Sequence, residues 1–428
     1  MAESPVELKK TISWVQGAAM TIGAVLGSGV LVLPVAAAEL AGPASLVAWL
    51  LMGLLAIPLV MTLGTLGAAY PDAGGIAAFA RRAFGPRAEA VTGWLFLGTV
   101  PIGGPIVALI GANYAGRLFG ATPWQVGLVA AGMLSAGLFF NYLGISLSGR
   151  VQIGVVATIS LILLAAVLTA LPRVRPDSFT PFAPHGWVPV GVAMTLLFWA
   201  FVGWEMIVHL GEEFRDPQRD IPRSLAFSLG IIIVLYLSLA VATVGTASYR
   251  GAANITALAG MVGQGVGHWA GDVTALLGFL VCYGTIHTYL AGFSRLIYAQ
   301  AREGHFPSFF ARLHPRYQTP HRTLLVLGPV FFLVLLLAYY RQFDLSALIK
   351  WPSAVFIALY VIGMASGVKL LAGKGRYYAM VSLAACLIVY GFLGWAGLYP
   401  IGLGVVGWLT TQKRWPVQAR GRDRRETV

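Results

Sequence analysis

The sequence predicts an all-α membrane protein with about twelve transmembrane helices. Composition is the first observation: 58% of the 428 residues are hydrophobic and 11% are charged, whereas a soluble domain carries about 25% charged residues. Long apolar runs along the whole chain are the second. The third is the placement of lysine and arginine, which gather in alternate connections between the runs. Together these observations exclude a soluble globular protein and a disordered chain.

Twelve apolar runs are candidate transmembrane helices, since a span needs about 20 residues. They lie at residues 13–38, 44–69, 90–116, 123–142, 151–171, 189–210, 224–247, 270–298, 323–340, 345–371, 376–392 and 394–411. Most lack helical amphipathicity, as expected where one face meets lipid and the other meets apolar neighbours.

The charges of the connections predict how the chain is oriented. If the N-terminus is cytoplasmic, the cytoplasmic connections hold 23 of the lysines and arginines and the outer connections hold 6, which accounts for all 29. This bias predicts that both termini are cytoplasmic. It also explains the net charge of +13 without a nucleic-acid partner. The basic tail from Lys413 to Arg425 is expected to contact lipid headgroups.

Two of the runs contain residues that weaken a helix in mid-membrane. The first run includes Gly27-Ser28-Gly29, and the sixth carries Gly203 two residues before Glu205. Glycine has poor helix propensity, and serine competes for backbone hydrogen bonds. Breaks at matching positions five spans apart are typical of the substrate site of a secondary transporter. The alternative explanation is close packing, which glycine also serves in membrane helices.

The matching breaks divide the chain into two repeats of five spans. Because five is an odd number, the second repeat is inverted relative to the first in the membrane. We expect a cytoplasmic N-terminus at 1–12, the first repeat at 13–171, an outer loop at 172–188, the second repeat at 189–371, two further helices at 372–412 and a basic cytoplasmic tail at 413–428.

Two titratable side chains within the apolar runs are candidates for function. Glu205 is the only acid well inside a run, and a buried carboxylate in a membrane is a functional candidate. We expect it to accept hydrogen bonds from N–H groups freed by the break or to carry a proton, and a purely structural role is the alternative. His287 lies in the eighth run, where it either titrates or packs as a neutral residue. His287 and Tyr289 are candidate pocket residues.

Motifs of enzymes and cofactor sites give no support for catalysis. The sequence contains no H-E-x-x-H, no G-x-S-x-G and no P-loop. Residues 402–407 match G-x-G-x-x-G, but they lie in an apolar run with no strand before it, which indicates helix packing. We therefore predict no enzyme activity, no cofactor and no metal site.

Five segments together resemble the amino acid–polyamine–organocation (APC) family of transporters. They follow one another along the first eight spans with the spacing usual in that family. They are residues 22–34 with the pattern G-S-G-V-x-x-x-P, then 71–86, 198–205, 212–223 and 294–304. Together with residues 91–97, the chain is most similar to the bacterial exporters of methionine and branched-chain amino acids. The resemblance implies a LeuT-like fold of two inverted five-helix repeats plus two helices, in the bacterial inner membrane.

The resemblance also implies where a substrate amino acid binds. In the family, its carboxylate meets backbone N–H groups in the first break, its amino group meets carbonyls at the ends of the half-helices, and an aromatic gate covers it. The matching positions here are Val25, Gly27, Ser28, Gly29, Val30, Trp199, Val202 and Gly203, with Trp199 as the gate. Helix physics agrees, since helix N-termini attract anions and C-termini attract cations.

One departure from the family bears on coupling. Some proton-coupled members carry a lysine in the fifth helix, and the equivalent position here is near Ile159. No lysine or arginine occurs from Val151 to Leu171, which leaves Glu205 as the proton carrier or exchange without protons. The sequence also has no second membrane acid near the site, which favours a neutral substrate over a cationic one.

The sequence therefore predicts a secondary active transporter of neutral apolar amino acids, namely methionine, leucine, isoleucine and valine. Export or antiport by alternating access is expected, with protons as a candidate coupling ion. An uptake permease or an exchanger of other amino acids or polyamines is the first alternative. A membrane nutrient sensor that does not transport is an alternative of another class. The expected partners are the amino acid and the lipid bilayer, and the oligomeric state stays open.

Overall fold

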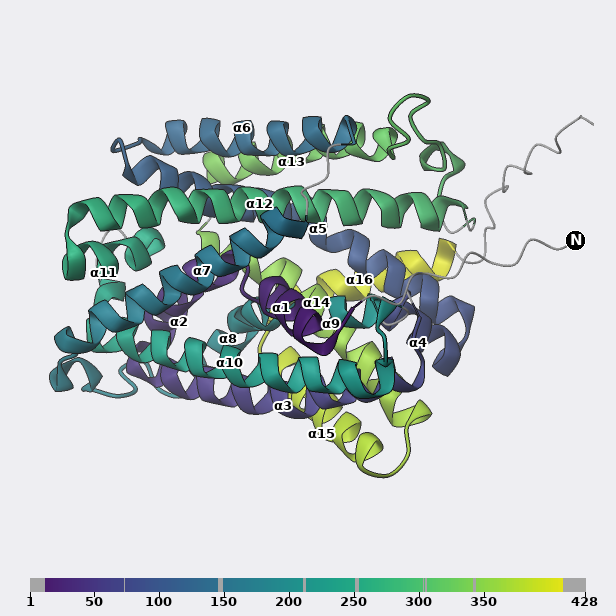
Figure 1. Ribbon diagram of the computed structural model, residues 1–428, viewed down its shortest axis with the longest axis horizontal. Helices are drawn as coiled ribbons and strands as arrows, with labels where there is room; N and C mark the ends of the chain where they lie inside the picture. The colour runs from purple at the N-terminus through teal and green to yellow at the C-terminus, as the bar shows by residue number, and fades with distance from the viewer. Residues whose placement is uncertain are drawn as a thin grey trace, which may run out of the picture.

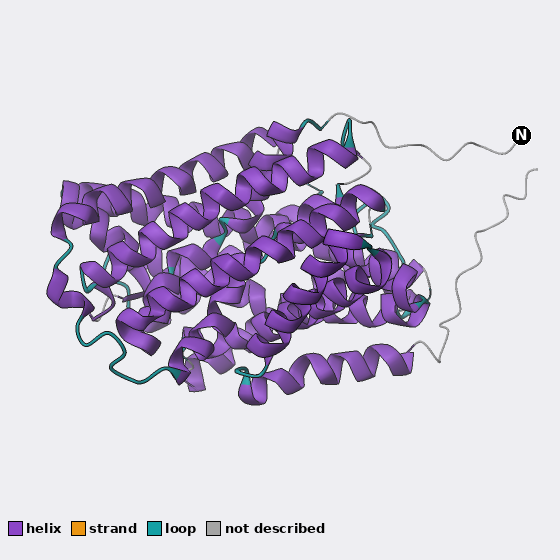
Figure 2. Cartoon of the chain, turned by 90° about the horizontal axis from the view of Figure 1, so that it is seen from below, coloured by secondary structure: helices purple, strands orange, loops and turns teal. Residues whose placement is uncertain are grey.

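In the computed structural model, helices make up most of the chain (Figure 2). The structure describes residues 12–72, 74–144, 149–210, 213–250, 254–302, 304, 306–341 and 344–410. Within these ranges there is no β-strand, and the one isolated β-bridge pairs Ile12 with Phe214. The predicted N-terminal segment up to residue 11, the basic tail from residue 411 onward, and Gly211 and Glu212 lie outside the described residues. The fold is therefore all-α, as the sequence predicts.

The first five predicted runs correspond to six helices, because the first run is broken. They are α1 (Trp14–Val25) and α2 (Leu33–Ala41), α3 (Ser45–Ala69), α5 (Pro86–Arg117), α6 (Pro123–Tyr142) and α7 (Gly149–Ala170). A short amphipathic helix, α4 (Gly75–Phe84), precedes α5 and has Arg81 and Arg82 in its last turn. Basic residues there favourably face the negative end of the helix dipole.

The sixth run is also broken, and the remaining runs follow in order. They are α8 (Val188–Leu197) with α9 (Trp204–His209), α10 (Pro217–Gly245), α12 (His268–Arg302), α13 (His321–Arg341), α14 (Leu345–Leu370), α15 (Gly373–Tyr390) and α16 (Leu398–Thr410). A short helix, α11 (Ala257–Val266), lies between α10 and α12. Both breaks therefore occur in the runs where the sequence predicts them.

Nine stretches of the described chain are individually long and apolar enough to cross a membrane. This number is smaller than twelve for physical reasons. The broken first run contributes only the 12 residues of α1, and α2 continues into α3 as one apolar stretch. Helix α15 begins with a turn that carries Lys374 and Arg376. Helix α16 has 13 residues, about 20 Å at 1.5 Å per residue, which is shorter than the hydrocarbon core.

The two broken segments lie at the centre of the bundle. In the most apolar part of Val188–Val208, 78% of the residues are buried, compared with 22% in the most apolar part of α6, which lies at the periphery. Figure 1 shows α1 and α9 in the middle, with α12 on one side and α10 and α3 on the other. Central placement removes both breaks from lipid, where an unpaired backbone group would be costly.

Polar contacts fix α1 to α10 and to the segment after α9. The hydroxyl of Ser224 donates to the carbonyl of Trp14 at 2.7 Å, and that of Ser228 donates to the carbonyl of Ala18 at 3.1 Å. At the start of the chain, the N–H of Ile12 donates to the carbonyl of Glu213 at 3.0 Å. Helix α1 and the residue before it are thus held against α10 and against the segment that follows α9.

Candidate functional site

The first break separates α1 from α2. The amide of Leu26 donates to the carbonyl of Ile22, and that of Gly27 donates to the carbonyl of Val25, both at 2.8 Å. Gly27 is extended (φ −87°, ψ −163°), and a 3-10 turn, Ser28–Leu31, follows. The first two N–H groups of that turn, from Ser28 and Gly29, have no acceptor within it. The break therefore presents buried backbone donors in the core of the bundle.

The second break separates α8 from α9. A 3-10 turn, Phe198–Phe201, leads to an extended Val202, and Gly203 then adopts φ 122° and ψ −15°. This positive φ favours glycine. A Cβ atom on Gly203 would lie 2.8 Å from both the C and O atoms of Ala24. The absence of a side chain at Gly203 therefore allows the two breaks to touch.

Tyr236 of α10 connects the carbonyl ends of the two interrupted helices. Its buried hydroxyl lies 3.1 Å from the carbonyl oxygen of Val25 and 2.9 Å from that of Ala200. The hydroxyl has one proton and donates it to one of these carbonyls at a time. The other carbonyl therefore keeps a lone pair for a ligand, although that of Val25 also accepts the N–H of Gly27. The ring of Tyr236 packs edge-on against Trp49 and Phe201, each with a centroid separation of 5.2 Å.

Trp199 covers the first break. A Cβ atom on Gly29 would lie 2.6 Å from Cδ1 of the Trp199 indole, so the ring is directly against this residue. On another side, the indole lies against Gly103 of α5, and Phe356 of α14 meets it edge-on with centroids 6.0 Å apart. Beside this covered residue, a Cβ atom on Gly27 would meet nothing within 4 Å. The sequence-predicted gate thus lies over Gly29, and open space adjoins Gly27.

Glu205 is held inside the second break. The residue is 4% exposed, and its Oε2 accepts the N–H of Gly203 at 3.0 Å and the hydroxyl of Tyr360. Tyr360 belongs to α14 and is fully buried. The carboxylate therefore accepts one backbone donor freed by the break and one side-chain donor from another span, which offsets the cost of its burial.

The two candidate pocket residues of α12 lie in different surroundings. The carbonyl of His287 accepts from Asn141 of α6 at 3.1 Å, and its buried ring lies 6.3 Å from that of Tyr283. Tyr289, by contrast, is 44% exposed. Of the two candidates, His287 is therefore the buried one.

Sequence reasoning missed Tyr236 and Tyr360. Both are uncharged residues of apolar runs and neither breaks a helix, so no local signal distinguishes them from packing residues. No group of three or more His, Cys, Asp or Glu side chains within the described part of the chain is arranged to hold a metal ion.

Comparison with known proteins agrees with this architecture. The family model described as amino acid permease matches residues 12–410. The chain belongs to the amino acid permease family. An uncharacterized amino acid permease of Bacillus subtilis, YecA, is 44% identical over 404 residues, which cover 94% of this chain and 95% of the relative.

Two further relatives carry more specific names. The L-methionine/branched-chain amino acid exporter YjeH of Escherichia coli is 33% identical over 411 residues, covering 95% of this chain and 97% of the relative. The branched-chain amino acid permease BcaP of Bacillus subtilis is 26% identical over 322 residues, covering 70% and 69%. This member of the amino acid permease family is accordingly a multi-pass membrane transporter and not an enzyme.

Proposed function

We propose that this permease is a secondary transporter of neutral apolar amino acids, with methionine, leucine, isoleucine and valine as substrates. We further propose that it works by export or antiport in a bacterial inner membrane, with both termini cytoplasmic. The relationship to the exporter YjeH supports this choice of substrates and direction. The charge bias of the connections supports the orientation.

The observation that carries the proposal is the contact between the two breaks at Gly203 and Ala24. The first break carries the N–H groups of Ser28 and Gly29, and the carbonyls of Val25 and Ala200, one from each interrupted helix, lie close enough to share the hydroxyl of Tyr236. N–H groups suit a carboxylate, and carbonyls suit an ammonium group. A zwitterionic substrate would thus be bound by backbone alone, with Trp199 and Phe356 offering apolar surface to its side chain.

Alternating access follows from the same arrangement. The matching breaks support two inverted repeats, residues 13–171 and 189–371, that rock around a substrate held between them. We propose that Glu205 carries the coupling proton. A proton on this carboxylate would weaken its hydrogen bond with Gly203 and thereby loosen the second break.

Counterflow in proteoliposomes tests the substrate class. Vesicles preloaded with unlabelled methionine should accumulate labelled methionine and leucine, whereas preloaded lysine or putrescine should not support accumulation. Gly29→Val is the matched inactive control, because a side chain there crowds Trp199. Counterflow driven equally well by lysine would contradict the neutral substrate class, and binding without flux would indicate a sensor.

A further inference from the structure

An apolar groove lies apart from the residues of the two breaks, where α4, α5, α14 and α16 meet. It has a volume of about 420 Å³. Its walls include Val91 of α5, Ile362 and Ala365 of α14, and Trp408 of α16. Phe84 and Arg87, at the junction of α4 and α5, also line it. Figure 1 shows α4 and α16 at the same end of the bundle.

The chemistry of the groove matches an acyl chain. Apart from Arg87, its lining side chains are apolar. Phe84 is 48% exposed and Trp408 is 46% exposed, so the groove opens to the surroundings of the bundle. In a membrane protein these surroundings are lipid at the level of the spans. An apolar groove at that level is filled by hydrocarbon, since exposing it to water would be unfavourable.

Two cations flank this groove. Arg87 is exposed on the first turn of α5, and the ammonium of Lys369 lies 5.2 Å from the centroid of the Phe84 ring. Neither forms an ion pair with a carboxylate within the described ranges. An arginine in the first turn of a helix is unfavourable, because it lies near the positive end of the helix dipole. An anionic partner for Arg87 would offset this cost.

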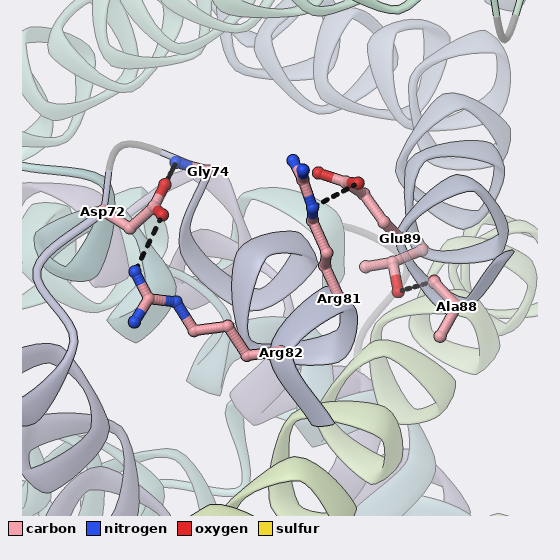
Figure 3. A network of polar contacts seen from close by, with 7 residues as sticks. Asp72, Gly74, Arg81, Arg82, Ala88 and Glu89 are labelled. Atoms are coloured by element: carbon pink, nitrogen blue, oxygen red, sulfur yellow. Dashed lines mark hydrogen bonds and ion pairs between the residues drawn. The ribbon is translucent and has the colours of Figure 1, made fainter. Parts of the chain in front are cut away.

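Two neighbouring arginines form ion pairs with carboxylates in the same region (Figure 3). Arg81 pairs with Glu89 at 3.6 Å, and Arg82 pairs with Asp72 at 3.6 Å. The carboxylates closest along the chain are thus engaged with other arginines. Arg87 therefore remains available to a phosphate beside the groove.

We propose that this groove binds one anionic phospholipid, with an acyl chain along Val91, Ile362 and Ala365 and the phosphate between Arg87 and Lys369. Basic pockets between membrane helices bind such headgroups. The chain's own C-terminal tail is a poor occupant, because it carries six lysines and arginines, from Lys413 to Arg425, against two acids. This site is independent of the substrate and of the direction of transport.

Native mass spectrometry of the purified full-length protein tests the headgroup contacts. The delipidated protein is titrated with phosphatidylglycerol or with phosphatidylcholine of the same acyl chains. The double variant Arg87→Gln/Lys369→Gln should bind the first phosphatidylglycerol about thirtyfold more weakly, given about 1 kcal/mol per basic residue. The control Arg219→Gln/Arg312→Gln removes the same charge from exposed positions elsewhere and should bind like the unmodified protein.

A second variant tests the acyl-chain contact with both cations intact. Ala365→Phe should fill the groove and weaken phosphatidylglycerol binding at least about tenfold. Ala384→Phe, at an exposed position of α15, is its control. Unfolding temperatures in phosphatidylcholine establish that each variant is folded. Equal phosphatidylglycerol binding by the test and control variants, or equal binding of the two lipids by the unmodified protein, would overturn the proposal.

Discussion

The two breaks at the centre of this permease interrupt their helices in different ways. The first contains a 3-10 turn, Ser28–Leu31, and has no charged side chain of its own to bind the N–H groups of that turn. The second also contains a 3-10 turn, Phe198–Phe201, but its chain then turns at Gly203, whose N–H donates to the carboxylate of Glu205. The first break is therefore suited to bind a ligand, and the second is suited to hold its own conformation.

Space around the glycines shows the same difference. A Cβ atom on Gly27 would meet nothing within 4 Å, whereas one on Gly203 would clash with the backbone of Ala24. Gly29 is intermediate, because the atoms nearest to its position belong to the Trp199 side chain, which is able to move. The comparison therefore predicts that a substitution of glycine by alanine has the largest effect at Gly203, a smaller one at Gly29 and the smallest at Gly27.

Gly203→Ala should have the largest effect. The substitution places an L side chain at φ 122°, which costs about 1–3 kcal/mol, and adds a contact of 2.8 Å with backbone atoms that have no rotamer to change. We expect loss of transport and a clearly lower unfolding temperature in detergent. Gly230→Ala, in α10 with nothing within 4 Å, is the matched control and should unfold at or above the temperature of the unmodified protein. Equal stability of the two variants would mean that the breaks do not need to touch.

Gly29→Ala should come next, because the added methyl group displaces Trp199 rather than backbone. We expect apparent affinity for methionine to fall at least about tenfold, or 1.4 kcal/mol, with little change in unfolding temperature. If the indole of Trp199 transmits the effect, Gly29→Ala should lower the affinity for methionine less in a Trp199→Ala background than in the unmodified protein. If the losses of binding free energy in the two single variants simply add in the double variant, Trp199 does not cover this site.

Glu205→Gln should alter coupling more than folding. Glutamine retains an oxygen that accepts the N–H of Gly203 but cannot carry the proton or the charge. If Glu205 carries the coupling proton, we expect transport by this variant to lose its dependence on pH. Tyr360→Phe is the comparison variant, since it removes one donor to the carboxylate, at about 1.5–3 kcal/mol, and leaves the acid in place. A pH profile for Glu205→Gln that matches the unmodified protein would assign the residue a structural role.

The sequence predicts the breaks well because their causes are local. Glycine and serine within an apolar run weaken a helix at that position, whatever surrounds it. The same reasoning locates Glu205, since an acid in an apolar run stands out without knowledge of its partners. The sequence also predicts the all-α class and the order of the spans, which depend on hydrophobicity alone.

The tyrosines that complete the site escape such reasoning because their partners are distant in the chain. Tyr236 approaches a carbonyl 211 residues away, and Tyr360 donates to a carboxylate 155 residues away. A tyrosine in an apolar run has no sequence feature that reports such a contact. His287 illustrates the reverse problem, since it stands out in the sequence while the structure buries its ring beside that of Tyr283.

Gly27→Ala should have the smallest effect on folding and the most selective effect on transport. Its extended backbone is open to any residue, and the methyl group would enter unoccupied space, so stability should change by less than about 0.5 kcal/mol. If that space receives the substrate, a methyl group there should weaken binding of methionine more than binding of the smaller valine. Competition by the two amino acids for labelled leucine measures this ratio, with Gly132→Ala as the control because its position is equally open. An unchanged ratio of methionine affinity to valine affinity would place the substrate away from Gly27. The first break would then contact the substrate only through the N–H groups of Ser28 and Gly29.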